Sequence, residues 1–157
     1  MRIGIGYDSH RFGAGDGVLL GGVRIPAEVA LIGHSDADAV AHAVTDAILG
    51  AAALGDIGAL YPDSDPANKN RDSISMLAAV RFRLRDAGWL VNNVDVTVVC
   101  ETPRVGPHRD AIRNNLATAL GIPVDSVWIK GKTNEQMGWI GRGEGVAVIA
   151  VASVHGA

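Results

Sequence analysis

The sequence predicts an α/β fold of the α+β sandwich type, in which a single mixed β-sheet packs against about three helices. Apolar segments typical of strands alternate along the chain with three segments of helical character. The chain has no internal repeat, low-complexity segment or linker, and its 157 residues favour one domain over residues 1–157. Aromatic residues are scarce, so Ala, Val, Leu and Ile are expected to form most of the core.

The N-terminal half is expected to supply two extended segments and the first helix. Gly21-Gly22 interrupts the second extended segment and indicates a hairpin. The helix is Ala-rich and follows a polar loop that contains helix-starting residues. In order, we expect a strand at 2–9, the hairpin at 18–26, a polar loop at 33–38, a helix at 38–54 and a long loop at 55–71.

The C-terminal half is expected to alternate two helices with three strands. Gly88 ends the first of these helices, and the second starts at Pro107 and stops at Gly121, a common arrangement of proline first and glycine last. The last segment is an apolar run bounded by glycines, which favours a buried strand. In order, we expect a helix at 72–87, a strand at 93–101, a helix at 107–121, and strands at 125–132 and 145–154.

Charge and composition exclude several classes of protein. The net charge is −3 without a basic block, which argues against a nucleic-acid partner. No apolar run is long enough for a membrane span, and no signal peptide is recognised, so we expect a cytoplasmic protein without a membrane partner. Cys100 is the only cysteine, which excludes an intrachain disulfide and a Cys-rich zinc site.

A candidate metal site combines the first strand with the first helix. Asp8 and His10 are two residues apart, so in a strand they point to the same face, and we expect them at the end of that strand. Each motif alone also fits a plainer role, as an ion pair or a surface histidine. Asp8, His10 and His42 together make an oxygen–nitrogen–nitrogen set that suits catalytic zinc, with a fourth position open.

The first helix carries a row of polar residues with i, i+4 spacing. Asp38, His42 and Asp46 share one helix face, and it points away from the apolar row that includes Val40 and Val44. Asp38 or Asp46 could therefore accept the second ring N–H of a ligating histidine and orient its ring.

Two further segments suit phosphate chemistry. Residues 130–145 combine lysines, Thr133 and Glu135 in a glycine-rich stretch, where the glutamate could hold a second hard cation. Residues 100–109 pass from a strand into a helix start, where backbone N–H groups could bind an anion or a nucleobase edge. A glycine-rich loop with solvated charges remains an alternative for residues 130–145, and an ordinary connecting loop remains one for residues 100–109.

The whole chain resembles the 2-C-methyl-D-erythritol 2,4-cyclodiphosphate synthase family of the non-mevalonate isoprenoid pathway. Several motifs carry this resemblance in order along the chain. They are RIGIGYDSHRF at 2–12, GGVRIP at 21–26, HSDADAVAHAVTDAILGAAALGDIG at 34–58, YPDSDP at 61–66, NVDVTVVCETPRVGPH at 93–108 and GRGEGVAV at 141–148.

The resemblance implies a reaction and its metal ions. A free phosphate of the substrate would attack the β-phosphorus of its cytidine diphosphate, release CMP and close an eight-membered ring. Asp8, His10 and His42 would hold Zn²⁺, and Glu135 would hold Mg²⁺ or Mn²⁺. His34, Thr133 and Glu135 would lie at the reacting phosphates as catalytic residues.

The resemblance also implies a set of substrate contacts. His34 and Ser35 would contact the phosphates, the segments 56–58 and 61–65 the methylerythritol part, and the segments 100–106 and 132–135 the cytidine. The implied substrate-binding residues are Asp8, His10, His34, Ser35, Asp56, Ile57, Gly58, Tyr61, Pro62, Asp63, Ser64, Asp65, Cys100, Glu101, Thr102, Pro103, Arg104, Val105, Gly106, Lys132, Thr133, Asn134, Glu135, Trp139 and Arg142.

The family forms a homotrimer, so the resemblance implies active sites between subunits and a central apolar channel. Trp139 and Arg142 would lie at this channel, which could take an isoprenoid diphosphate. The chain departs from the usual family pattern at Arg104, Asn134 and Trp139. Two alternatives remain at this stage: a zinc-dependent phosphoesterase acting on a small phosphorylated metabolite, and a non-catalytic trimer that binds an isoprenoid diphosphate.

Overall fold

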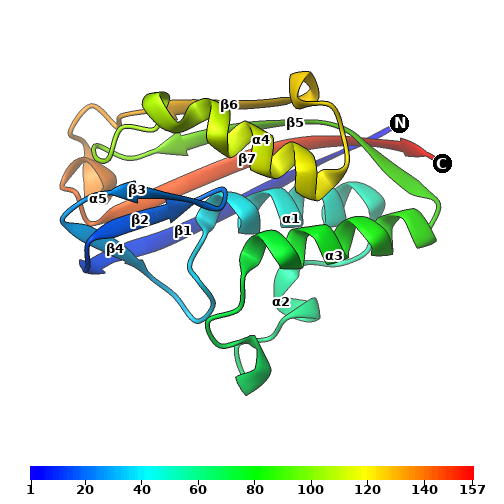
Figure 1. Cartoon of the computed structure of the whole chain (residues 1–157), viewed down its shortest axis with the longest axis horizontal. Helices are drawn as coiled ribbons and strands as arrows, with labels where there is room; N and C mark the ends of the chain where they lie inside the picture. Colours follow the sequence, from blue (N-terminus) through cyan, green and yellow to red (C-terminus); the bar gives the residue numbers. More distant parts are fainter.

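A mixed five-stranded sheet organises the computed structural model, which describes residues 1–157 (Figure 1). The strand order is β4-β1-β7-β5-β6. β5 and β6 pair in parallel, and the other neighbouring strands pair antiparallel. The strands are β1 (Arg2–Ala14), β4 (Val29–Ile32), β5 (Trp89–Val99), β6 (Val127–Lys132) and β7 (Gly145–Gly156).

Three long helices pack together on one side of this sheet. α1 lies against β1 and β7, α4 lies against β6, and α3 contacts β5 and packs between α1 and α4. A separate hairpin of β2 and β3 lies beside β4 and the N-terminal part of α1. No helix of the structure has the length and apolar character required to cross a membrane. The elements are α1 (Ala39–Ala52), α3 (Ser73–Asp86), α4 (Arg109–Leu120), β2 (Gly17–Leu20) and β3 (Val23–Pro26).

The start of α1 is fixed by a buried carboxylate. Asp38 caps the helix by accepting hydrogen bonds from the backbone N–H groups of Val40 and Ala41. It also accepts hydrogen bonds from Gly21 and Gly22, at 2.8 and 2.6 Å, which attaches the β2–β3 turn to the helix. Burial raises the pKa of Asp38, although the backbone N–H groups oppose this shift. Asp38 is therefore a structural N-cap.

Two glycines bring α1 into direct contact with β1. A Cβ atom on Gly4 would lie 2.1 Å from the carbonyl oxygen of Ala47, and one on Gly6 would lie 1.8 Å from that of Ala43. Neither position can hold a side chain unless the helix moves. Gly4, Gly6, Asp8 and His10 are every second residue of β1 and therefore lie on the same face of the strand. This face has no side chains at the two glycines and polar side chains at Asp8 and His10.

The opposite face of the sheet is apolar and exposed. Ile3, Ile5 and Tyr7 of β1 are 70%, 69% and 56% exposed, and Ile149 and Val151 of β7 lie beside them in register. Isolated exposed apolar residues are ordinary, but a contiguous patch of this kind indicates an interaction surface.

The predicted fold class is confirmed, with differences in detail. β1 extends to Ala14, so Asp8 and His10 lie within the strand and not at its end as expected. β4 was not predicted, nor were the short helices α2 (Ile57–Leu60) and α5 (Gly138–Gly141). The loop 55–71 contains α2 and a 3₁₀ turn at 66–68, and a second 3₁₀ turn at 106–108 precedes α4.

The predicted polar face of α1 needs correction. The sequence pattern suggested that the row of Asp38, His42 and Asp46 faces away from the core. In the structure α1 lies between the sheet and α3, and Asp38 is fully buried. His42 and Asp46 are partly buried, so this row faces other parts of the protein.

Candidate active site

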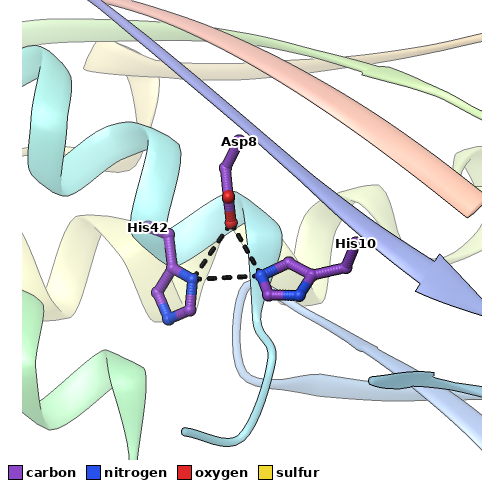
Figure 2. A group of neighbouring side chains, drawn as sticks. All are labelled: Asp8, His10 and His42. Atoms are coloured by element: carbon purple, nitrogen blue, oxygen red, sulfur yellow. Dashed lines mark hydrogen bonds and ion pairs between the residues drawn. The ribbon is translucent and has the colours of Figure 1, made fainter. Parts of the chain in front are cut away.

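Asp8, His10 and His42 meet at one point between β1 and the first turn of α1 (Figure 2). The Asp8 Oδ2 atom lies 2.9 Å from His10 Nε2 and 3.0 Å from His42 Nδ1, and the two ring nitrogens are 3.4 Å apart. All three residues are partly buried. The sequence analysis singled out these three residues, which lie on two separate elements, and the structure brings them together.

The outer nitrogen atoms of the two rings are held by groups that sequence analysis did not identify as partners of these rings. His10 Nδ1 lies 2.8 Å from the carbonyl oxygen of Ile32 on β4 and donates to it. His42 Nε2 lies 2.8 Å from Ser73 Oγ and 3.1 Å from Ser35 Oγ. These contacts leave the inner nitrogen atoms, His10 Nε2 and His42 Nδ1, facing Asp8.

Neither Asp38 nor Asp46 orients a histidine ring, contrary to the prediction. Asp38 uses its carboxylate to cap α1, and Asp46 accepts a hydrogen bond from the Ile57 N–H at 2.8 Å. Both carboxylates lie four residues from His42 along the helix. Their oxygens, however, accept hydrogen bonds from backbone N–H groups, including those of Gly21, Gly22 and Ile57 in other segments. Asp46 instead attaches α2 to α1.

The charges at this point favour a cation between the three side chains. Burial raises the pKa of Asp8, but the contacts with His10 and His42 outweigh burial and hold that pKa below its ordinary value. Burial lowers the pKa of His10, but the contact with Asp8 outweighs it and raises that pKa above its ordinary value. The carboxylate therefore stabilises positive charge beside it.

These residues fit a metal ion by geometry and by chemistry. Two nitrogen atoms and one carboxylate oxygen converge on one point, and such a set suits a divalent ion such as zinc. Ligand atoms around a tetrahedral ion with bonds of 2.0–2.1 Å are about 3.3 Å apart, close to the separations found here. The three ligand atoms thus need only small shifts to accept an ion.

A hollow of about 440 Å³ opens over the three side chains. It brings together His34 and Ser35 with residues of the segments 56–58 and 61–65, which the family resemblance assigned to substrate contacts. The Nε2 atom of His34 is buried and has no hydrogen-bond partner in the protein. The lining consists of Asp8, His10, Gly33, His34, Ser35, His42, Ile57, Gly58, Tyr61, Pro62, Asp63, Asn68 and Met76.

Three predicted contacts of this region lie outside that lining. Asp56 caps α2 by accepting from the Ala59 N–H, and Asp65 caps the turn at 66–68 by accepting from the Ala67 N–H, at 2.8 and 2.9 Å. Ser64 is exposed between them. Their assignment as substrate-binding residues stays a prediction.

A second hollow of about 500 Å³ lies where β5 and β6 end. It gathers most of the residues predicted for the cytidine. Glu101 Oε1 accepts hydrogen bonds from the N–H groups of Asn134 and Gln136, at 2.9 and 3.2 Å, and so holds the two segments together. The lining consists of Cys100, Glu101, Pro103, Arg104, Val105, Gly106, Pro107, Arg109, Gly131, Lys132 and Thr133.

No residue lines both hollows. Glu135 is exposed on the loop after β6, 3.4 Å from the Thr133 hydroxyl, and it is not part of the Asp8–His10–His42 cluster. Thr102 is exposed near the second hollow but does not line it. Trp139 lines a small third hollow with Ser9, His10, Arg11 and Glu144. Arg142 donates to Glu144 at 2.6 Å.

Several residues of these sites carried no sequence signal that singled them out. Asn68 and Met76 line the first hollow, and Arg109 lines the second. Ser73 is one of two serines in the first turn of α3, and only its contact with His42 distinguishes it from Ser75. Its position after the capping residue Asp72 could have placed it at a helix start, but not beside a histidine 31 residues away.

A mixed sheet with an aspartate–histidine pair on β1 and a histidine on α1 defines a class of α/β proteins with a candidate metal site beside a ligand-sized hollow. The model of the YgbB family matches residues 1–155, and the chain belongs to this family.

Known proteins of this family resemble the chain over almost its whole length. The chain is 58% identical to the 2-C-methyl-D-erythritol 2,4-cyclodiphosphate synthase of Gemmatimonas aurantiaca, over 98% of this chain and 93% of that protein. The solved structure of the bifunctional IspDF from Campylobacter jejuni has a TM-score of 0.95 and 39% identity, and the match covers 99% of this chain and 42% of that longer one. A CDP complex of IspF from Plasmodium falciparum has a TM-score of 0.86 and 33% identity, with 99% and 96% coverage.

Proposed function

We propose that this chain is a metal-dependent phosphorus–oxygen lyase that converts 4-diphosphocytidyl-2-C-methyl-D-erythritol 2-phosphate to 2-C-methyl-D-erythritol 2,4-cyclodiphosphate and CMP. The observation that carries the proposal is the convergence of Asp8, His10 and His42 under a hollow in a chain of this family. Its relatives are named for this synthase activity, and one related structure is a CDP complex. This support favours the synthase over a zinc-dependent phosphoesterase.

The reaction joins two anionic groups, so charge and position control its rate. Zn²⁺ at the triad and Mg²⁺ or Mn²⁺ at Glu135 would, when bound, offset the negative charge of the phosphates. The chain itself contributes no nucleophile, because the attacking oxygen belongs to the substrate. Its task is to hold the free phosphate and the β-phosphorus in line for attack, which alone can supply a large part of the rate.

Each hollow is suited to one part of the substrate. His34 and Ser35 lie in the first hollow near the triad, where a buried ring nitrogen and a hydroxyl suit phosphate oxygens. Lys132, Thr133 and Arg104 lie in the second hollow, where cations and a hydroxyl suit the nucleotide end. We assign the phosphate and methylerythritol parts to the first hollow and the cytidine to the second.

We further propose a homotrimer with each active site between two subunits. The exposed apolar face formed by Ile3, Ile5, Tyr7, Ile149 and Val151 supports an assembly that covers it. The separation of the two hollows supports it independently, because a partner subunit could bring its second hollow to the first hollow of its neighbour. The third hollow at Trp139, beside Arg142, would then belong to a central channel, with an isoprenoid diphosphate as a candidate ligand.

The cyclisation assay tests the proposed function directly. The purified protein is incubated with the cytidylyl substrate, with and without a chelator, and the products are separated. We expect the cyclic diphosphate and CMP in equal amounts, and loss of both after chelation. Release of inorganic phosphate, or of CMP together with a linear 2,4-bisphosphate, would support the phosphoesterase instead, and absence of turnover with full metal loading would contradict both.

A further inference from the structure

The hydroxyl group of Ser73 lies between a carboxylate and the His42 ring. Ser73 is 1% exposed, and its Oγ atom lies 2.8 Å from His42 Nε2. The same hydroxyl donates to Asp36 Oδ1, and the Ser73 backbone N–H donates to Asp36 Oδ2 at 2.8 Å. Asp36 thus binds Ser73 with both carboxylate oxygens and fixes its position at the start of α3.

This arrangement determines the direction of the hydrogen bond to His42. A serine hydroxyl has one hydrogen atom, and here Asp36 receives it, so Ser73 offers His42 only a lone pair. The hydrogen atom of that contact must therefore be on His42 Nε2. In this tautomer of the neutral ring, Nδ1 has the lone pair, and Nδ1 is the atom that faces Asp8 and His10.

Asp8 is the one neighbour that favours the other tautomer, because its Oδ2 lies 3.0 Å from His42 Nδ1 and a carboxylate only accepts. A metal ion bound between them would take the place of that hydrogen atom, whereas the Ser73 contact at Nε2 would remain.

Ser35 Oγ lies 3.1 Å from His42 Nε2, but its only other hydrogen bond is a 3.4 Å contact from the Ala37 N–H. Its hydroxyl hydrogen is therefore not committed to a carboxylate. The oxygens of Asp38 and Asp46, the two acids on the same helix as His42, accept from backbone N–H groups.

We propose that Asp36 and Ser73 are positioning residues that hold His42 in the tautomer whose Nδ1 can bind a divalent metal ion. The inference rests on the metal site of the proposed function, but not on its reaction. The Asp36–Ser73–His42 contacts also join the loop before α1 to the start of α3. Two backbone bonds support this junction, from Asp36 N to Arg71 O at 3.2 Å and from Asn70 N to His34 O at 3.1 Å.

The first test measures zinc affinity by competition with a chromophoric chelator. Ser73→Ala removes the acceptor of the Nε2–H, and we expect zinc to bind about 10- to 100-fold more weakly, as for other hydrogen-bond partners of metal-binding histidines. Ser73→Thr keeps the hydroxyl and should retain most of the affinity. Ser75→Ala is the matched control, because Ser75 is exposed on the same helix turn, and its affinity should equal that of the unmodified protein.

The second test reads the tautomer without any metal. In Asp36→Asn the amide can donate to Ser73 Oγ, which turns the hydroxyl hydrogen toward His42 Nε2 and moves the ring hydrogen to Nδ1. Two-bond ¹H–¹⁵N correlation spectra of the metal-free protein at mildly alkaline pH should show a larger share of the Nε2–H form in the unmodified chain than in Asp36→Asn, because Ser73 favours the hydrogen on Nε2 while Asp8 favours it on Nδ1. They should show a shift toward the Nδ1–H form in Asp36→Asn, with weaker zinc binding. Thermal unfolding checks that each variant is folded.

The outcomes separate this inference from the proposed function. If the unmodified protein binds zinc, and folded Ser73→Ala and Asp36→Asn bind it equally well with an unchanged His42 tautomer, the inference is overturned while the function stands. If the unmodified protein binds no zinc, the metal site of the proposed function is overturned. The tautomer spectra, which need no metal, then still decide whether Asp36 and Ser73 orient the ring.

Discussion

The two hollows of this protein are built in opposite ways. Around the first hollow, side chains from β1, α1 and α3 hold one another, and His10 and His42 each have their outer nitrogen bonded. Around the second hollow, exposed loops carry the polar side chains, and the main tie is the Glu101 carboxylate on two backbone N–H groups. The first hollow is suited to fix a small ion, and the second to receive a flexible nucleotide.

Removal of His42 should have the largest effect, because it destroys the fixed part of the first hollow. We expect His42→Ala to lose stoichiometric zinc and to lower turnover to the level of the chelated protein. The loss should exceed the roughly 10- to 100-fold that changes in outer hydrogen-bond partners cost. Metal analysis and the cyclisation assay measure both effects. His155→Ala, at an exposed histidine near the C-terminus, should change neither, and zinc retained in folded His42→Ala would disprove the ligand assignment.

A substitution at Glu135 tests the role of the exposed loops, because Glu135 lies on such a loop and outside the triad. We expect Glu135→Gln to keep its zinc and its assembly but to lose most of its turnover. High Mg²⁺ or Mn²⁺ should partly restore activity, because excess ion offsets weaker binding by mass action. Glu28→Gln is the matched exposed control. Loss of zinc in Glu135→Gln, or normal turnover without an added divalent ion, would contradict the two-metal assignment.

Mixing these two variants tests whether the hollows of different subunits work together. In a trimer with sites between subunits, co-assembled His42→Ala and Glu135→Gln chains form some sites with both residues intact. Random assembly of equal amounts should restore about a quarter of the unmodified activity. Light scattering should report the trimer throughout. If activity does not rise above that of the separate variants although mixed trimers form, the two hollows do not share a site across subunits.

Protons should compete with metal at the first hollow. The contact with Asp8 raises the pKa of His10 above 6.5, so the metal-free site keeps its proton to a higher pH than an ordinary histidine. In the metal-free protein, this pair stabilises the fold below the ordinary histidine pKa and loses that contribution as the pH rises through the raised one. The pKa of Asp8 is lowered, so its stabilisation of the folded state is complete above the ordinary aspartate pKa. That stabilisation is lost as the pH falls through the lowered pKa. Apparent zinc affinity should therefore increase as the pH rises through the His10 pKa, and chelator competition at several pH values measures this; no change with pH would contradict the raised pKa.

Cys100 should give the smallest effect, because it borders the second hollow as an unreactive thiol. Burial, with a smaller contribution from the charge of Glu101, raises its pKa from 9.0 to about 11. At about pH 8 its thiolate fraction should be about 100-fold below that of an ordinary thiol, and labelling correspondingly slower. Labelling kinetics in folded and denatured protein measure the ratio. Rapid labelling of the folded protein would show that this part of the second hollow opens more than the structure indicates.

Periodicity in the sequence identified the elements that carry the triad, and spacing identified its three residues. Sequence patterns did not predict the contacts that join segments distant along the chain. The oxygens of Asp38 and Asp46 are used by N–H groups of residues 21, 22 and 57, which helix spacing could not reveal. Ser73 and Asp36 meet through the packing of α3 against the loop before α1, and neither lies in a motif with metal-ligand spacing. Edge strand β4 was missed because its four residues show no clear alternation.

The glycines of β1 set the distance between this strand and α1. At Gly4 and Gly6 the two elements touch without side chains, and further along the strand they hold a carboxylate and an imidazole between them. The carbonyl oxygen that a Cβ atom on Gly6 would meet belongs to Ala43, the residue that follows His42 on α1. A methyl group at Gly6 would therefore push this part of α1 away from β1 and change the reach of His42 toward Asp8 and His10. Ligand distances in a metal site are expected to lie within about 0.2 Å of their usual values. Gly4 and Gly6, which are not among the three candidate ligands, thus set the spacing of the ligand atoms through the distance between β1 and α1.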